Sequence, residues 1–247
     1  MQKVTQIYGI RAVIEAINNG ETIEKVFVQR GLKGDLAKEL ESSLRKNGVN
    51  TSYVPFEKLN RLTNNNHQGV VANISPIVFH TIEELVEEVM ANDKKLPLFL
   101  LLDQLSDVRN FGAIIRTAEC SGVDGIIIQK KGSAPVTSDT IKTSAGAAFK
   151  VPIAKVDHIK DAVYYLQASQ IPVVAATEKT DSTLYEVDFK GPCAIVMGSE
   201  DRGISPSILK SVDYLAKIPL FGTIGSLNVS VACGVFLYEV ARQRLGY

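Results

Sequence analysis

Apolar runs alternate with amphipathic segments through the second half of the chain. The clearest run, 98–103, reads Leu-Phe-Leu-Leu-Leu-Asp and follows Pro97. A run of this kind predicts a strand that is buried on both faces. Further strands are expected at 125–129, 172–177, 193–197 and 215–218, with helices at 110–121, 138–148, 159–169, 205–212 and 228–244. Buried strands that alternate with helices predict a parallel α/β sheet covered by helices on both faces.

Shorter helices and strands alternate over the first 75 residues. Helices are expected at 9–19, 35–47 and 56–62, and strands at 25–29, 52–54 and 70–74. Asp35 is placed to cap the second of these helices. The alternation predicts a small αβ domain, residues 1–75, with a core of its own. Its polar loop 64–69 contains His67, which either makes local hydrogen bonds or contacts a substrate.

Residues 76–97 differ in composition from the segments on either side. A glutamate-dense helix is expected at 81–92, bracketed by Pro76 and Pro97 and followed by the charged cluster 93–95. Prolines and charges around a solvated helix are typical of a connector. We therefore expect a linker at 76–97, followed by a second domain that comprises residues 98–247.

Composition and charge narrow the class of protein without identifying it. The 247 residues are 45% hydrophobic and 22% charged, as in ordinary globular proteins. Lys and Arg together number 27, and so do Asp and Glu, so no overall positive field indicates a nucleic-acid partner. No apolar run approaches the ~20 residues that cross a bilayer. Since Met1 leads directly into structured sequence, we expect no signal peptide and a cytoplasmic protein without a membrane partner.

The cysteines Cys120, Cys193 and Cys233 are odd in number and far apart. Their spacing matches neither a disulfide framework nor a redox motif. No histidine or cysteine spacing is typical of a metal site either. We therefore expect buried, reduced thiols and no bound metal.

The segment that follows the run 98–103 carries Asn110 and Arg116. Asn110 is expected to cap a helix with an apolar inner face. Arg116 interrupts the apolar pattern and lies roughly 600° around the helix axis from Asn110. One interpretation is a surface arginine on an amphipathic helix. The other is an arginine near the C-terminal end of a central strand, where open α/β sheets bind their ligands.

Two glycine-bearing loops, 196–203 and 218–228, follow successive strands late in the chain. They read VMGSEDRG and IPLFGTIGSLN. Glycine lets a ligand approach the backbone closely, and free backbone groups supply hydrogen bonds. Either loop alone could be an ordinary turn, but Glu, Ser and Asn at their tips favour a binding site. The sequence has no GxGxxG after its run 98–103, no Walker loop and no GxSxG elbow.

Three segments of the second domain resemble, in order, the motifs of the SpoU/TrmH family. They are Asn110-x-Gly-Ala-x-x-Arg116-Thr-Ala, Gly198-Ser-Glu200-x-x-Gly203 and Ile218-Pro-Leu-x-Gly-x-x-x-Ser226-Leu-Asn228-Val-Ser230. In the first domain, Ile7-Tyr-Gly-Ile-Arg-Ala-Val and His67-Gln-Gly-Val-Val-Ala resemble the substrate-binding module of that family. The second motif departs from many relatives at Asp201-Arg202, where they carry a small residue and a lysine. The resemblance covers essentially the whole chain.

This resemblance implies an RNA ribose 2′-O-methyltransferase of the SPOUT superfamily that uses S-adenosylmethionine. It implies a SPOUT-type parallel sheet with a C-terminal trefoil knot, preceded by the small αβ substrate-binding domain. It also implies a homodimer, in which Val235, Phe236 and Leu237 are expected to share the core and the interface. The implied catalytic residues are Arg116, Asn110, Glu200, Ser226 and Asn228. The implied cofactor contacts are Thr177, Gly198, Ile218, Leu220 and Leu227.

The implied reaction is the attack of a ribose 2′-oxygen on the sulfonium methyl group. Because a guanidinium keeps its proton at neutral pH and is a poor base, we expect Arg116 to bind a phosphate and polarise the 2′-oxygen. A substrate phosphate or a water then takes the proton. The two-domain layout is similar to that of bacterial enzymes that methylate a guanosine of large-subunit ribosomal RNA. The alternatives are the same chemistry on transfer RNA or on a resistance-type rRNA site, and a non-catalytic RNA-binding assembly protein.

Overall fold

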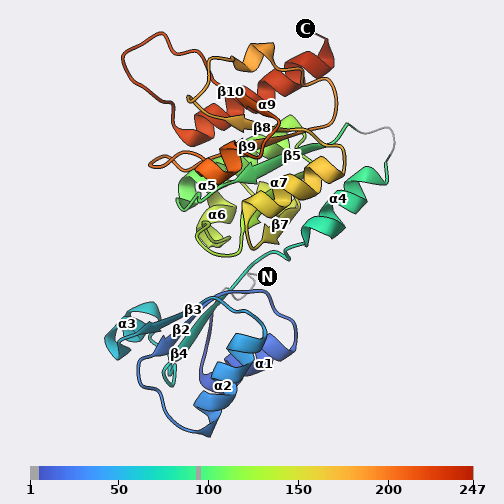
Figure 1. Ribbon diagram of the computed structural model, residues 1–247. Coiled ribbons are helices and arrows are strands. Elements are labelled where there is room, and N and C mark those ends of the chain that lie inside the picture. Colours follow the sequence, from blue (N-terminus) through green and yellow to red (C-terminus); the bar gives the residue numbers. More distant parts are fainter. Residues whose placement is uncertain (1–5, 93–95, 247) are drawn as a thin grey trace. The chain divides into compact units, whose positions relative to one another are not determined.

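The computed structural model describes residues 6–92 and 96–246. The chain forms two units: the first ends at Val78 and also includes the short segment Pro135–Ser138, and the second comprises the remaining residues from Phe79 onward. Each of the two units contains its own sheet (Figure 1). Within the described residues, no helix combines the length and the apolar character that crossing a membrane requires.

The first unit contains a four-stranded sheet with the strand order β1-β4-β2-β3. Its elements are β1 (Gln6–Tyr8), α1 (Ile10–Asn18), β2 (Ile23–Gln29), α2 (Asp35–Lys46), β3 (Thr51–Val54), α3 (Phe56–Leu62) and β4 (Val70–Ile74). Helices α1 and α2 pack on one face, around Val26, and α3 packs on the other through Leu59. The elements expected from the sequence are present. Strand β1 is additional, because three residues are too few to display a periodic pattern.

The second unit contains six parallel strands in the order β10-β8-β9-β5-β6-β7. The strands are β5 (Leu98–Leu102), β6 (Gly125–Gln129), β7 (Ile153–Val156), β8 (Val173–Ala176), β9 (Cys193–Met197) and β10 (Tyr214–Ala216). The helices are α4 (Ile82–Met90), α5 (Val108–Ser121), α6 (Ser138–Thr143), α7 (Ile159–Ala168), α8 (Pro206–Leu209) and α9 (Val229–Leu245), with short 3-10 turns at Ala147–Phe149 and Leu184–Glu186. The predicted parallel α/β sheet is confirmed. Strand β7 was not predicted, because its four residues include Lys155 and follow a proline.

The path of the chain determines which helices cover which face of this sheet. From β5 to β7 the chain steps in one direction along the sheet, and from β7 to β8 it crosses back. Because such crossovers are right-handed, α5 and α6 lie on the face opposite α7. Helix α9 packs against α5, while α4, α7 and α8 share the core of the other face (Figure 1). The trefoil knot stays a prediction.

Helix α4 differs from the solvated connector that the sequence pattern predicted. Its apolar residues Ile82, Leu85, Val86 and Val89 are buried in the core of the second unit. His80, just before the helix, pairs with Ala154 next to the sheet. The charged cluster 93–95 lies outside the described residues. The glutamates therefore occupy one side of a helix whose other side packs, and α4 belongs to the second unit.

Two predicted helix caps are wrong. Gly34, at φ +117°, is the N-cap of α2, and Asp35 is its first helical residue. In α5 the cap is Asp107, whose carboxylate accepts the N–H of Asn110 at 2.7 Å. Short polar residues are also common in the first helical turn, so the pattern defines a helix start only to within a few residues.

Two of the three cysteines are buried, as the sequence predicts. Cys193 and Cys233 are buried, and burial raises the pKa of Cys193 to about 11 and that of Cys233 to about 12. Cys120 is exposed, so the expectation of a buried thiol is wrong there. It lies on the outer side of α5, beside Glu119.

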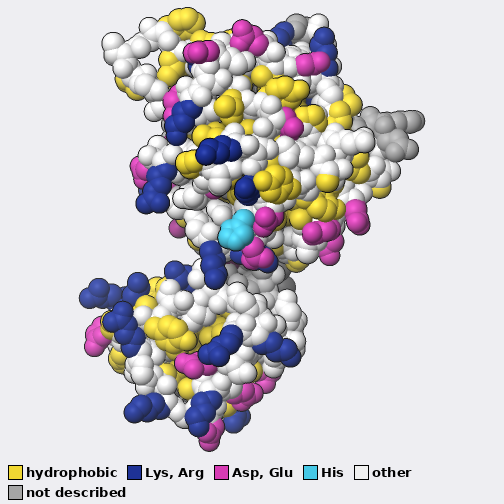
Figure 2. All heavy atoms as spheres, in the orientation of Figure 1, with side chains coloured by type: hydrophobic (Ala, Val, Ile, Leu, Met, Phe, Trp, Pro, Cys, Tyr) yellow, Lys and Arg dark blue, Asp and Glu magenta, His cyan; other side chains and the backbone are white. Residues whose placement is uncertain are grey.

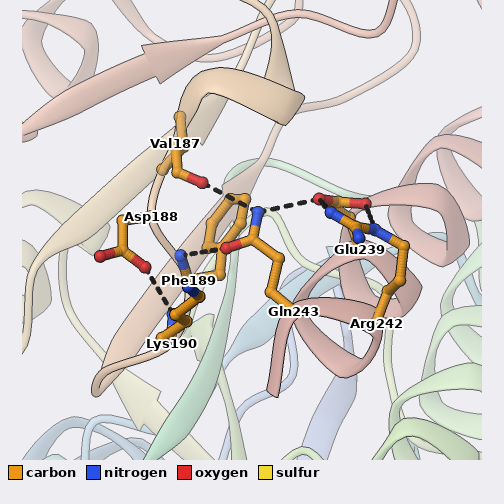
Figure 3. Close-up of polar contacts among 7 residues, drawn as sticks. All are labelled: Val187, Asp188, Phe189, Lys190, Glu239, Arg242 and Gln243. Atoms are coloured by element: carbon orange, nitrogen blue, oxygen red, sulfur yellow. Dashed lines mark hydrogen bonds and ion pairs between the residues drawn. The ribbon is translucent and has the colours of Figure 1, made fainter. Parts of the chain in front are cut away.

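The last turns of α9 are fastened to the segment before β9 (Figure 3). The Gln243 side chain accepts the N–H of Phe189 at 2.9 Å and donates to the carbonyl of Val187 at 3.0 Å. Buried Glu239 accepts hydrogen bonds from Gln243 and Arg242, which together lower the pKa of its carboxyl group. These contacts hold the helix whose other end reaches the candidate site.

Candidate active site

A pocket of about 620 Å³ lies where β8, β9 and β10 end. These strands are parallel neighbours, so their carboxyl ends meet at one edge of the sheet, as in ligand sites of open α/β folds. The volume is within the range of small-molecule sites. The structure places all five residues of the expected cofactor set in its lining: Thr177, Gly198, Ile218, Leu220 and Leu227.

The loop after β9 forms one wall of the pocket and depends on Gly198. A Cβ atom there would lie 2.2 Å from the carbonyl carbon of Gly203. The chain folds back on itself at this point, and the N–H of Gly203 donates to the carbonyl of Ser199 at 2.9 Å. Any side chain at position 198 would therefore displace backbone rather than another side chain.

Buried Asp103, at the end of β5, anchors the far end of this loop. One of its carboxylate oxygens accepts the Ser205 N–H at 2.8 Å and the Ser205 hydroxyl at 2.6 Å. Sequence analysis did not assign a role to this pair. The available signal was a carboxylate directly after a fully buried strand, where an unpartnered charge is costly.

Asn228 joins three separate segments at the edge of the pocket. As the N-cap of α9, its side-chain oxygen accepts the N–H of Ser230 at 2.9 Å. This bond assigns the amide orientation and turns the NH₂ group outward. The NH₂ group donates to the Asn110 side-chain oxygen at 3.1 Å and to the Glu200 carboxylate. We call Asn110, Glu200 and Asn228 the Asn228 cluster.

The Asn228 cluster leaves polar groups free for a ligand. Glu200 and Asn228 line the pocket, and Asn110 reaches it through its bond to Asn228. Within the described residues, the contact to Asn228 is the only hydrogen bond of the Glu200 side chain. Ser226 also lines the pocket and is exposed. Four of the five expected catalytic residues thus gather at one place.

Arg116 does not join them within one chain. It is exposed and lies eight residues into α5, about 12 Å along the axis from the first helical residue. Within the described ranges its guanidinium makes no hydrogen bond or ion pair. Within the described residues of a single chain, Arg116 therefore matches the interpretation of a surface arginine: it neither lines the pocket nor bonds to the Asn228 cluster.

The pocket lining combines apolar side chains with opposite charges. Glu178 and Lys179, which sequence analysis missed, follow Thr177 directly at the end of β8. Asp201 and Arg202, the residues that depart from the second motif, also contribute. Such a lining suits a ligand with an apolar heterocycle and a zwitterionic end. Among the described residues, no three His, Cys, Asp or Glu side chains are grouped to hold a metal ion.

Two of the three residues that were expected at a subunit interface are too deeply buried to contact another subunit. Phe236 and Leu237 are buried inside the chain, while Val235 is half-buried. The exposed apolar residues of α9 are instead Val231, Tyr238 and Leu245. The expected place in the core is therefore confirmed for Phe236 and Leu237, while their expected place in an interface is wrong, because the helix turns both toward the core.

Comparison with known proteins agrees with this arrangement. Residues 97–238 match the SpoU rRNA Methylase family, and residues 6–78 match the RNA 2′-O ribose methyltransferase substrate binding family. A TrmH family tRNA/rRNA methyltransferase of Staphylococcus saprophyticus is 38% identical, over 96% of this chain and 95% of its own length. The Bacillus subtilis TrmH family protein YacO is 31% identical, over 98% and 97%.

A solved structure shows the same fold. The SpoU methyltransferase AviRb from Streptomyces viridochromogenes, crystallised with AdoMet, matches 98% of this chain and 90% of its own. The TM-score is 0.62 at 24% sequence identity. The family match over more than half of the chain and the full-length relatives lead to one conclusion: the chain belongs to the SpoU/TrmH family of RNA methyltransferases.

Proposed function

We propose that this chain transfers a methyl group from S-adenosylmethionine to a ribose 2′-hydroxyl of RNA, with a guanosine of large-subunit rRNA as the target. The observation that carries the proposal is the position of the Asn228 cluster at the mouth of a pocket of cofactor size. A methyl transferase must bring its donor and its acceptor oxygen together in line. A ligand pocket bordered by fixed polar groups supplies both requirements.

The pocket residues fit S-adenosylmethionine. Ile218, Leu220 and Leu227 offer apolar surface for the adenine ring, and Lys179 with Glu178 offers charges for the amino-acid end. The bound cofactor supplies an electrophilic methyl group on a sulfonium. Gly198 lets the loop after β9 fold back onto the backbone of Gly203, and this close return builds one wall of the pocket.

The Asn228 cluster is suited to orienting a ribose. Asn228 holds the Glu200 carboxylate by a hydrogen bond, which leaves the second oxygen free to accept from a ribose hydroxyl. Asn110 uses its side-chain oxygen toward Asn228, so its NH₂ group remains a donor. Ser226 supplies a hydroxyl from the loop before α9.

Arg116 completes the site from a second copy of the chain. It is exposed on α5, and α5 packs against α9, which presents the apolar residues Val231 and Tyr238 to solvent. A symmetric dimer covers such a surface and brings α5 of one copy toward the site of the other. There the guanidinium binds an RNA phosphate and polarises the 2′-oxygen, while a phosphate oxygen or water accepts the proton.

The first unit holds the RNA in this proposal. Arg11, Arg30 and Lys33 are exposed and Lys25 is half-buried, and Figure 2 shows Lys and Arg side chains prominent on the visible face of this unit. Such residues bind phosphates without regard to sequence. The separate domain favours rRNA over tRNA, since the shorter tRNA enzymes of the family lack it.

The experiment that tests the function is a comparison of 2′-O-methyl positions in RNA from cells with and without the gene. We expect one guanosine of large-subunit rRNA to lose its methyl group. If only tRNA loses a methyl group, the target is tRNA and the proposed reaction is unchanged. Unchanged methylation in both RNAs, with the purified chain binding RNA but transferring no methyl group, would support the non-catalytic assembly protein.

A further inference from the structure

A second hollow, of about 650 Å³, lies in the first unit and is not used by the proposed chemistry. It is formed at the ends of β2 and α3 and by the loop 63–69. Its side chains are uncharged amides together with Thr63, Phe56 and His67. We propose that this hollow binds one unpaired nucleobase of the RNA substrate; the inference rests on the proposed function.

Phe56 supplies a flat apolar wall. It is 47% exposed at the start of α3, and its ring lies 5.0 Å from that of His67. A half-exposed phenylalanine beside polar groups is typical of a stacking platform, because every base has a π-face. The two rings are tilted by 54°, and the exposed part of Phe56 is open to a ligand.

His67 is buried and holds the hollow in shape. Its Nδ1 accepts the N–H of Gly69 at 3.0 Å, so the ring proton is on Nε2, which donates to the Asn60 side-chain oxygen at 2.9 Å. Asn60 is thereby oriented with its NH₂ group free. Gly69 has φ +83°, a backbone conformation that other residues adopt only with strain, and a Cβ atom there would lie 2.8 Å from the terminal methyl of Leu32.

The remaining lining offers both donors and acceptors. Within residues 6–92 and 96–246, the side chains of Asn64, Asn66 and Gln68 make no hydrogen bond to the rest of the chain, and all three are exposed. Side-chain amides match the edges of bases, which combine donors and acceptors. The lining has no charged side chain, so it offers a phosphate no ion pair.

Three cations are close in the sequence to residues that line the hollow, and none of the three lines it. Arg30 follows Gln29 of the lining, and its Nε donates to the carbonyl of Tyr53 at 3.1 Å. Lys58 and Arg61 are exposed on α3 on either side of Asn60. Phosphates that flank an inserted base would meet these cations together with Glu57, which is also exposed on α3. The neutral hollow with cations nearby fits an unstacked nucleotide better than a duplex.

The test compares two RNA probes on the full-length chain. One is a hairpin with a randomised unpaired loop, and the other is a fully paired duplex of equal length. Phe56→Ala and Phe56→Leu should weaken hairpin binding roughly 5- to 100-fold, with duplex binding and the salt slope unchanged. Phe56→Trp should retain binding, because it retains a stacking face. Tyr53→Ala, an exposed aromatic outside the hollow, is the matched control.

A fluorescent base in the loop gives a second readout. 2-Aminopurine should be quenched on binding to the native chain and to Phe56→Trp, and not on binding to Phe56→Leu. Native-like hairpin binding by Phe56→Ala, or equal losses for hairpin and duplex, would overturn the inference while leaving the proposed function intact. If the native chain binds neither RNA, the RNA substrate itself is refuted and the inference falls with it.

Discussion

The two units build their polar sites in different ways. In the second unit, Asn228 contacts Asn110, 118 residues earlier, and Asp103 contacts Ser205, 102 residues later. In the first unit, His67 contacts Asn60 and Gly69, seven and two residues away. The site in the second unit therefore exists only when the whole sheet is folded, and the hollow in the first unit depends mainly on one turn of chain.

The largest effect is expected at Arg116, which we propose enters the site of the second unit from another copy of the chain. Arg116→Ala and Arg116→Lys should each reduce turnover about 100- to 1000-fold, since a lysine cannot reproduce the planar two-pronged contact. Cofactor affinity should stay near native, because the pocket lies at other strands. Single-turnover methyl transfer at saturating cofactor and RNA measures the effect. Arg45→Ala on α2 is the control. Native-like rates in Arg116→Lys would show that Arg116 is a surface arginine without a role in methyl transfer.

Two substitutions of Asn228 distinguish its role as the N-cap of α9 from its role in the Asn228 cluster. Asn228→Ala removes both, so we expect a loss of about 1 kcal/mol in unfolding free energy as well as a rate at least ~10-fold lower. Asn228→Asp keeps an oxygen for the Ser230 N–H but loses both donations and places a second carboxylate beside Glu200. Chemical denaturation should then show near-native stability with the rate still reduced. Equal activity in Asn228→Asp and the native chain would show that the Asn228 cluster has no role in methyl transfer.

Truncation tests whether the two units are independent. A chain that starts at Phe79 keeps α4 and should bind S-adenosylmethionine with native affinity, while RNA affinity falls by about 10-fold or more. A chain that starts at Lys94 loses the buried residues of α4 and should fail to fold. Calorimetry and circular dichroism measure both. Native RNA affinity in the Phe79 chain would contradict the role of the first unit.

The smallest effect is expected on stability, from the hydrogen bonds that Glu239 accepts near the C-terminal end of α9. The pKa of Glu239 is lowered by Arg242 and Gln243, so its contribution to stability is present above the ordinary glutamate pKa and is lost as pH falls through the folded value. In Glu239→Gln, the decline in unfolding free energy between about pH 5 and pH 3 should be shallower than in the native chain. Parallel pH profiles for the two chains would show that the carboxylate is not coupled to folding.

The sequence predicted the architecture well where patterns are long. The strand at Leu98–Leu102 is visible as an uninterrupted apolar run, and the loops after β9 and β10 are visible in their glycines. Thr177 and Ile218 came from family resemblance, and the structure places both in the pocket lining. In each case the information lies within one segment.

What the sequence did not show depends on contacts between segments. Helix α4 was taken for a solvated connector because its glutamates are conspicuous, although Leu85 and Val86 follow helical spacing toward a core. The partnership of Asp103 with Ser205 requires knowing that β5 lies beside β9. The separation of Arg116 from the Asn228 cluster requires the direction of α5. These are tertiary relations that periodicity does not carry.

The measurement that tests the central claim most directly uses a mixed dimer. Arg116→Ala and Asn228→Asp chains carrying different tags are co-expressed, and the dimer that contains one of each is purified. If each site takes Arg116 from one copy and Asn228 from the other, one intact site forms, and the mixed dimer should show about half of the native turnover. Both parent dimers should be nearly inactive. A mixed dimer as inactive as its parents, or a monomer that is fully active, would contradict a site shared between two copies.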